Sequence, residues 1–119
     1  MSTPRVTVVV ATRDRRESLL RSLQLLDQPG GPPVIVLDNG STDGTAEAVR
    51  TSHPRGQVVR LPTNAGAVAR TDGVRRAATP YVAFADDDSW WDPGALETAA
   101  DLLDAHPRVA VVVGRVRMA

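Results

Sequence analysis

Short valine-rich runs recur along the whole chain, with helix-like stretches between them. The runs occupy residues 6–10, 34–37, 58–61, 81–85 and 109–113. They are continuous rather than alternating, which indicates strands buried on both faces, as in a parallel sheet. The stretches with helical periodicity are 17–27, 44–52, 65–78 and 93–106. This β-α alternation predicts an α/β sandwich with a mainly parallel sheet and right-handed crossovers.

Composition narrows the chemistry that the chain can perform. Its 119 residues fit one domain, and 14 arginines balance 14 acidic residues, so no net charge favours nucleic acid as a partner. Lysine and cysteine are absent, which excludes lysine chemistry, thiolate nucleophiles and cysteine-bound zinc. No apolar run approaches the ~18 residues that span a bilayer, and no cleavable signal peptide is expected. We therefore expect a cytoplasmic location, either free or at the cytoplasmic face of the membrane.

Polar residues follow each of the first four valine-rich runs. These polar segments are 11–15, 38–45, 62–66 and 86–91. In an open α/β sheet, ligands bind outside the carboxyl ends of the strands, so we expect the four segments to gather at one edge. The first of them lacks the G-x-G-x-x-G of a dinucleotide dehydrogenase, and the absence of lysine excludes a P-loop NTPase.

Three consecutive aspartates, Asp86, Asp87 and Asp88, directly follow the run 81–85. Alternate side chains of an extended segment point the same way, so Asp86 and Asp88 can share one side. Two carboxylates there suit Mg²⁺ or Mn²⁺, whose coordination shell is completed by water and phosphate oxygens. The alternative is a solvated acidic loop tip that makes local turn contacts. We favour metal and diphosphate binding because the triplet follows a core strand.

Asp38 directly ends the second run, and an acidic residue at this place commonly binds the base or ribose of a nucleotide. The residues after it have the composition of a tight turn, in which Ser41 or Asp43 can cap the next helix. Thr12 lies in the turn after the first run, where its hydroxyl or backbone can contact a ligand.

Two further acidic residues have the spacing of helix caps. Asp14, with Glu17 three residues later, predicts a capping box for the first helix. Asp92, followed by Pro93, predicts the N-cap of the last helix. Both aspartates are therefore interpreted as structural.

Arg70 lies among small residues in the stretch 65–78. Small residues let a helix approach the sheet closely, so an inward Arg70 can pair with the aspartates or with a phosphate. A surface arginine is the alternative. Trp90 and Trp91 are interpreted as packing residues, although one of them can also form a wall of the pocket.

Four segments together resemble the nucleotide-sugar-binding half of the family 2 glycosyltransferases with the GT-A fold. The segments are 6–15, 34–45, 64–70 and 84–96. The resemblance implies a Rossmann-like α/β/α sandwich, incomplete at its C-terminus, with residues 1–119 as one nucleotide-sugar-binding domain. Ser89 is a departure, because many relatives have a fourth acidic residue there.

The resemblance also implies roles for single residues. Thr12 and Asp38 would help to hold the base, and Arg70 would lie beside the nucleotide. Asp86 or Asp87 would face the ribose. The DxD motif would be formed by Asp86 and Asp88, which would ligate Mg²⁺ or Mn²⁺, with Asp88 at the ion that bridges the diphosphate.

The implied activity is transfer of a sugar from a nucleoside diphosphate, preferably UDP, to a hydroxyl acceptor with inversion. No residue of this chain is identified as the catalytic base, which in the family follows the fifth strand. A partner chain or a further C-terminal region would supply that base. The second reading is a non-catalytic or truncated module that binds nucleotide sugars.

Overall fold

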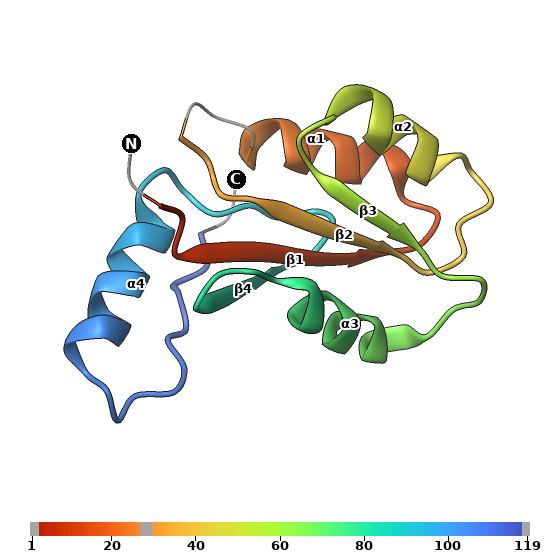
Figure 1. Cartoon of the computed structure of the whole chain (residues 1–119). Helices are drawn as coiled ribbons and strands as arrows, with labels where there is room; N and C mark the ends of the chain where they lie inside the picture. Colours follow the sequence, from red (N-terminus) through yellow and green to blue (C-terminus); the bar gives the residue numbers. More distant parts are fainter. Residues whose placement is uncertain (1–2, 27–29, 118–119) are drawn as a thin grey trace.

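A parallel sheet forms the centre of the molecule (Figure 1). A computed structural model describes residues 3–26 and 30–117 of the chain. In this part, four strands pair in the order β3-β2-β1-β4, and every pairing is parallel. The strands are β1 (Val6–Thr12), β2 (Val34–Asp38), β3 (Gln57–Arg60) and β4 (Tyr81–Ala85). The predicted α/β fold with a parallel sheet is confirmed.

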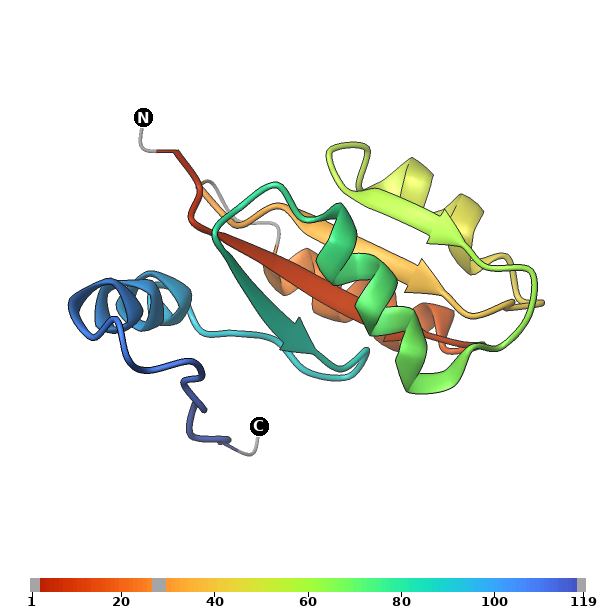
Figure 2. The ribbon, with the colours of Figure 1, turned by 60° about the horizontal axis from the view of Figure 1, so that its bottom comes forward.

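Helices cover both faces of this sheet. They are α1 (Arg16–Leu26), α2 (Thr45–Ser52), α3 (Ala69–Arg76), which follows the short 3-10 turn η1 (Gly66–Val68), and α4 (Ala95–Ala105). Figures 1 and 2 show α1 and α2 on one face, α3 on the other, and α4 beside the amino end of β1. The four predicted helices are confirmed, although the predicted last residue of the first, Asp27, lies outside the described residues.

The side chains of β1 are buried on both faces, as its continuous valine run predicted. Val8 and Val10 pack toward α1 and α2, whereas Val9 packs toward α3. The first core cluster consists of Val8, Val10, Leu19, Leu23, Leu26, Val36, Val49 and Ala85. The second consists of Val9, Ile35, Leu37 and Ala69. Trp91 packs against the first cluster, which confirms its interpretation as a packing residue.

The helix α3 approaches the sheet closely because Gly73 lacks a side chain. A Cβ atom at this position would lie 2.5 Å from Cγ1 of Val9 and 2.8 Å from Cδ2 of Leu37. Ala69, one turn earlier, is buried against the same face. The small residues of this helix therefore allow the close approach that the sequence predicted.

The predicted fifth strand, residues 109–113, is wrong. The segment has no strand assignment, and the side chains of Val111 and Val113 are 71% and 87% exposed. A strand needs the hydrogen bonds of a neighbouring strand, and no strand in the described part of the chain pairs with this segment. A valine-rich composition alone therefore does not produce a strand here.

The predicted cap of α4 is also wrong. The residue that caps α4 is Gly94, which adopts a left-handed conformation with φ of 82°. The backbone N–H of Ala95 donates to the carbonyl oxygen of Asp92 over 3.1 Å, so a turn separates Asp92 from the helix. The carboxylate of Asp92 instead pairs with Arg117.

A network of charges attaches α4 to the amino ends of β1 and β4. Arg5 pairs with Glu97 and Asp101 at 2.8 Å each and with Asp104 at 2.7 Å, and the hydroxyl of Tyr81 donates to Asp104. The hydrogen bond to Glu97 is the main reason that the pKa of Arg5 is raised. The hydrogen bond from Tyr81 lowers the pKa of Asp104. The network lies at the amino edge of the sheet, opposite the edge where ligands bind in such folds.

Among the described residues, none of the helices combines the length and the apolar composition needed to cross a membrane.

Candidate functional site

The carboxyl ends of the central strands carry the polar residues selected from the sequence. Thr12 of β1 lies in register with Asp38 of β2. The hydroxyl of Thr12 donates to Oδ2 of Asp87, just after β4, over 2.9 Å. Residues from three strand ends therefore meet at one edge, as the topology predicted.

Asp87 is the buried member of the aspartate triplet. Its exposure is 7%, and its carboxylate accepts from Thr12 at 2.9 Å and pairs with Arg15 at 3.2 Å. Its carbonyl oxygen accepts from the hydroxyls of Ser18 and Ser22, at 3.0 and 3.1 Å. These bonds fix the triplet to β1 and to the first turns of α1.

Asp86 and Asp88 are exposed and have arginine partners from opposite faces of the sheet. Oδ1 of Asp86 lies 3.0 Å from Nη2 of Arg70 on α3, and Oδ2 of Asp88 lies 3.5 Å from Nη2 of Arg15, next to α1. The expected extended segment is wrong, because the N–H of Ser89 donates to the carbonyl of Asp86 over 3.3 Å and closes a turn. The repulsion between adjacent carboxylates is thus offset by arginines of the chain itself.

Arg70 pairs with the aspartate triplet, which is one of the two roles that the sequence suggested, and its side chain is 39% exposed. Besides pairing with Asp86, its guanidinium carbon lies 5.9 Å from the centre of the Phe84 ring. Its Nε atom is buried without a hydrogen-bond partner among the described residues. Arg70 is therefore not an ordinary surface arginine, and its Nε–H remains able to donate.

Asp38 carries a buried carboxylate oxygen that lacks a partner. The residue is 1% exposed, and its Oδ1 accepts from the N–H of Ser41 over 3.0 Å. Its Oδ2 has no hydrogen-bond partner among the described residues. A buried acceptor without a partner is destabilising, so this oxygen can accept a hydrogen bond from a further donor.

Sequence reasoning missed Asn39, which joins two loops at this edge. Its Oδ1 accepts from the N–H of Ala65 over 3.2 Å, and its Nδ2 donates to the carbonyl of Gly66 over 3.3 Å. The signal was its position immediately after Asp38, within a stretch that was interpreted only as a turn. Asn39 holds the loop that precedes α3, and so helps to position Arg70.

The predicted capping box of Asp14 is wrong. Asp14 has φ of 52°, and its carboxylate accepts from the N–H of Thr42 over 2.7 Å. Its own N–H donates to the hydroxyl of Ser41 over 2.9 Å. Contacts with the loop after β2 thus direct Asp14 away from the start of α1.

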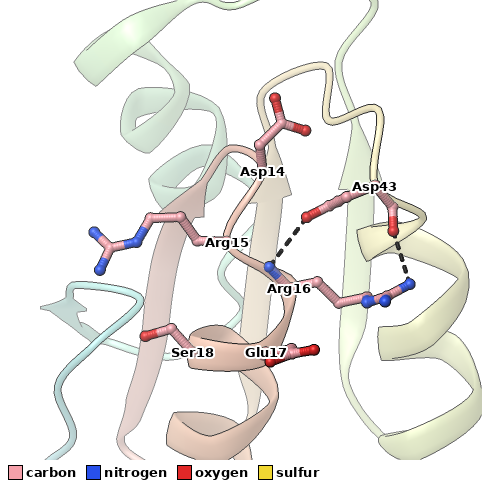
Figure 3. Close-up of a pocket in the computed structure, with 6 residues that line it drawn as sticks. All are labelled: Asp14, Arg15, Arg16, Glu17, Ser18 and Asp43. Carbon is pink, nitrogen blue, oxygen red and sulfur yellow. Dashed lines mark hydrogen bonds between the residues drawn. The ribbon is translucent and has the colours of Figure 1, made fainter.

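Asp43 accepts hydrogen bonds from the first N–H groups of α1 and α2, and Figure 3 shows the one from Arg16. Its Oδ2 accepts from the N–H of Arg16, the first residue of α1, over 3.2 Å. Its Oδ1 accepts from the N–H of Thr45, the first residue of α2, over 3.2 Å, and from the hydroxyl of Thr45. That hydroxyl is the main reason that the pKa of Asp43 is lowered. The N-cap residue of α2 is Gly44 rather than the predicted Ser41 or Asp43, and Asp43 lines an open pocket of about 310 Å³.

Asp43→Asn is expected to reduce the free energy of unfolding by about 1 kcal/mol at neutral pH, because a neutral amide interacts less favourably with two helix N-termini. The folded pKa of Asp43 lies below the ordinary 3.8, so its contribution is present above that value and is lost as pH falls through the folded pKa. The difference between the two proteins should therefore shrink as the pH falls below the ordinary pKa of 3.8.

Urea denaturation across this pH range measures the effect. Glu47→Gln also removes a carboxylate from the first turn of α2, where it pairs with Arg50, and so shows the effect of a charge without the N–H contacts that Asp43 makes. A difference between wild type and Asp43→Asn that does not change with pH would contradict the role of the Asp43 charge.

The donor set at the triplet suits a hard divalent cation as part of a larger site. Within residues 3–26 and 30–117, no group of three or more acidic or histidine side chains is arranged to hold a metal ion. Asp86 and Asp88 offer exposed carboxylate oxygens, and Mg²⁺ or Mn²⁺ commonly combines one or two carboxylates with phosphate oxygens and water. The turn no longer places Asp86 and Asp88 on one side by alternation, but each carboxylate can supply one ligand to a cation that arrives with a phosphorylated ligand.

A parallel sheet with a polar carboxyl edge is typical of α/β proteins that bind nucleotides. The chain belongs to glycosyl transferase family 2, whose family model matches residues 7–118. It is 31% identical to an N-acetylglucosaminyl-diphospho-decaprenol L-rhamnosyltransferase of Mycobacterium tuberculosis, over 92% of this chain and 39% of the relative. It is 29% identical to the succinoglycan biosynthesis protein ExoU of Rhizobium meliloti, over 76% of this chain and 28% of that protein. The chain thus spans less than half the length of these relatives.

Solved structures show the same fold. The mannosyltransferase PcManGT from Pyrobaculum calidifontis, in complex with GDP-Man and Mn²⁺, matches with a TM-score of 0.70 and 31% identity, over 86% of this chain and 33% of that one. S. aureus TarS 1-349, in complex with UDP-GlcNAc, matches with a TM-score of 0.71 and 29% identity, over 87% of this chain and 32% of that one. The expected GT-A fold is confirmed.

Proposed function

We propose that residues 1–119 form the donor-binding domain of a glycosyltransferase, which binds a nucleoside-diphosphate sugar at the carboxyl edge of the sheet. The observation that carries this proposal is the buried Oδ2 of Asp38, which has no hydrogen-bond partner in the described part of the chain and lies beside Thr12 at the ligand-binding edge. A nucleobase N–H or a ribose hydroxyl can donate the hydrogen bond that this oxygen lacks. Solved relatives that bind GDP-Man and UDP-GlcNAc support the class of ligand.

Each residue of the site is assigned to a different part of the nucleotide. Asp38 accepts a hydrogen bond from the base, with Thr12 alongside it. Arg70 lies next to the nucleotide and has a buried Nε–H without a partner among the described residues. Asp86 or Asp87 faces the ribose. UDP is the carrier favoured by the family resemblance, although the N–H groups of uracil and of guanine can both donate to a carboxylate.

Asp86 and Asp88 are the residues that would hold Mg²⁺ or Mn²⁺. When bound, the cation supplies Lewis-acid stabilisation of the departing diphosphate. Asp87 is already engaged with Thr12 and Arg15, and so keeps the turn that carries the two exposed carboxylates in place. The PcManGT complex, which contains Mn²⁺, supports the use of a divalent cation.

Sugar transfer to a hydroxyl acceptor, with inversion, is the reaction that we propose for the whole protein. A carboxylate base from a further C-terminal region or from a partner chain would deprotonate the acceptor. The alternative is a module that binds the donor without transferring the sugar, because no residue of this chain is assigned as the base. The cytoplasmic location expected from the sequence stays a prediction.

Calorimetric titration of the purified chain with UDP-GlcNAc and GDP-Man, each with and without Mn²⁺, tests donor binding. We expect saturable binding that Mn²⁺ strengthens, because the exposed carboxylates repel a diphosphate in the absence of a cation. Absence of binding to both donors under both conditions would contradict the proposal. Release of nucleoside diphosphate only when a hydroxyl acceptor is added would favour the transferase over the binding module.

A further inference from the structure

One guanidinium group, that of Arg15, bridges two members of the aspartate triplet. Its Nη1 lies 3.2 Å from Oδ1 of Asp87, and its Nη2 lies 3.5 Å from Oδ2 of Asp88. The side chains of these aspartates are 9% and 55% exposed. Arg15 therefore makes one contact with a buried carboxylate and one with a solvated carboxylate.

The backbone around Arg15 gives this bridge a rigid support. Arg15 directly precedes α1, and Ser18 and Ser22 of α1 both donate to the carbonyl of Asp87. The start of the helix and the triplet thus form one hydrogen-bonded unit. Figure 3 shows the side chain of Arg16 extending toward Asp43, whereas that of Arg15 extends away from Asp43.

The two contacts of Arg15 differ in strength. An ion pair with a buried, hydrogen-bonded carboxylate is hard to break, because breaking it leaves a charge with poor solvation. An ion pair between solvated groups contributes little and is easily replaced. The contact with Asp88 is therefore the one that a competing cation can displace.

We propose that Arg15 is an exchangeable counter-cation of the triplet and a positioning residue for the diphosphate. This inference rests on the proposed function. In the metal-free protein, Arg15 neutralises Asp87 and Asp88. When a divalent cation takes the carboxylate of Asp88, the guanidinium keeps its contact with Asp87 and directs the released N–H groups to the diphosphate oxygens, which arginine binds in a forked arrangement.

Two opposite effects follow from this exchange. Without nucleotide, Arg15 competes with the cation for Asp88, so its removal should strengthen the binding of Mn²⁺. With nucleotide present, Arg15 contributes hydrogen bonds to the diphosphate, so its removal should weaken the binding of UDP. A residue with a merely structural role would move both affinities in the same direction or neither.

Arg15→Gln tests the exchange, with binding of Mn²⁺ alone measured by electron paramagnetic resonance and binding of UDP in saturating Mn²⁺ measured by calorimetry. We expect Mn²⁺ affinity to rise about 2- to 5-fold, as for removal of a cation that makes an exposed ion pair. We expect UDP affinity to fall about 10-fold or more, as for loss of charge-assisted hydrogen bonds. Arg21→Gln, an exposed change of the same charge on α1, should alter neither affinity.

Arg15→Lys separates charge from geometry and serves as a second variant should Arg15→Gln fold poorly. It retains the positive charge without the fork, so Mn²⁺ affinity should stay near that of wild type while UDP affinity falls. If Arg15→Gln leaves both affinities unchanged, or lowers both, the inference about Arg15 is wrong. The proposed function still stands in that case, provided that the wild-type protein binds UDP. Failure of wild type to bind UDP and the two donor sugars would overturn both.

Discussion

Asp88→Asn is expected to lower the affinity of the chain for UDP in the presence of Mn²⁺ by about 10- to 100-fold, the range found when groups that support metal binding are removed. The amide is a weaker ligand for a hard cation than the carboxylate. The free energy of unfolding should change by less than about 0.5 kcal/mol, because Asp88 is 55% exposed and its ion pair with Arg15 spans 3.5 Å. Calorimetry and urea denaturation measure the two effects.

The adjacent Asp87 provides a matched control. Asp87→Asn is the same chemical change, but it affects a buried carboxylate that accepts from Thr12 and pairs with Arg15. It is expected to reduce the free energy of unfolding by about 1–3 kcal/mol. An Asp88→Asn protein that unfolds readily and yet keeps its affinity for UDP would show that the metal assignment is wrong.

Gly73→Ala is expected to reduce the free energy of unfolding by about 1–3 kcal/mol, the usual effect of overpacking a core. The same substitution in an unhindered helix stabilises by about 0.5–1 kcal/mol, so the sign itself is informative. The new Cβ would lie 2.5 Å from Cγ1 of Val9 and 2.8 Å from Cδ2 of Leu37. Thermal or urea denaturation measures the loss.

Two further variants test the cause of this loss. Val74→Ala changes an exposed position on the same helix and should be nearly neutral. Val9→Ala removes one of the clashing groups, so the double variant with Gly73→Ala should be less destabilised than the sum of the single variants. If the effects of the two substitutions on the free energy of unfolding were strictly additive, the loss of stability in Gly73→Ala would not come from the contact between α3 and β1.

Much of the fold followed from patterns that depend on local burial. The valines of β1 face two helical layers, and the small residues around Gly73 let α3 approach the sheet. The position of Asp38 at a strand end was also predictable from the sequence, because the carboxyl ends of parallel strands meet at one edge. In each of these cases the sequence contains the cause of the structure.

Other features depend on contacts between distant segments, which the sequence does not reveal. The turn at the triplet is fixed by Ser18 and Ser22 of α1, so the partners of Asp86 and Asp88 were not predictable from alternation along an extended strand. The sequence likewise does not indicate that Arg15, rather than another arginine near it, faces these carboxylates.

The predictions of the helix caps and of a strand at the last valine-rich run were wrong for the same reason. Asp14 has the spacing of a capping box, but Ser41 and Thr42 hold it elsewhere, and Asp43 takes its place. Residues 109–113 have the composition of a strand, but a strand also needs a neighbour to pair with. The structural preference of a short segment is therefore overridden where contacts with distant residues determine its conformation.

The way in which α4 is attached has a consequence for the response of the molecule to dissolved salts. The acidic face of this helix is held by the guanidinium of Arg5 and the hydroxyl of Tyr81, whereas α1 and α3 are held mainly by apolar packing against the valines of β1. Sulfate screens exposed ion pairs and at the same time strengthens apolar burial. A rising sulfate concentration should therefore weaken the attachment of α4 while it strengthens the packing of α1 and α3.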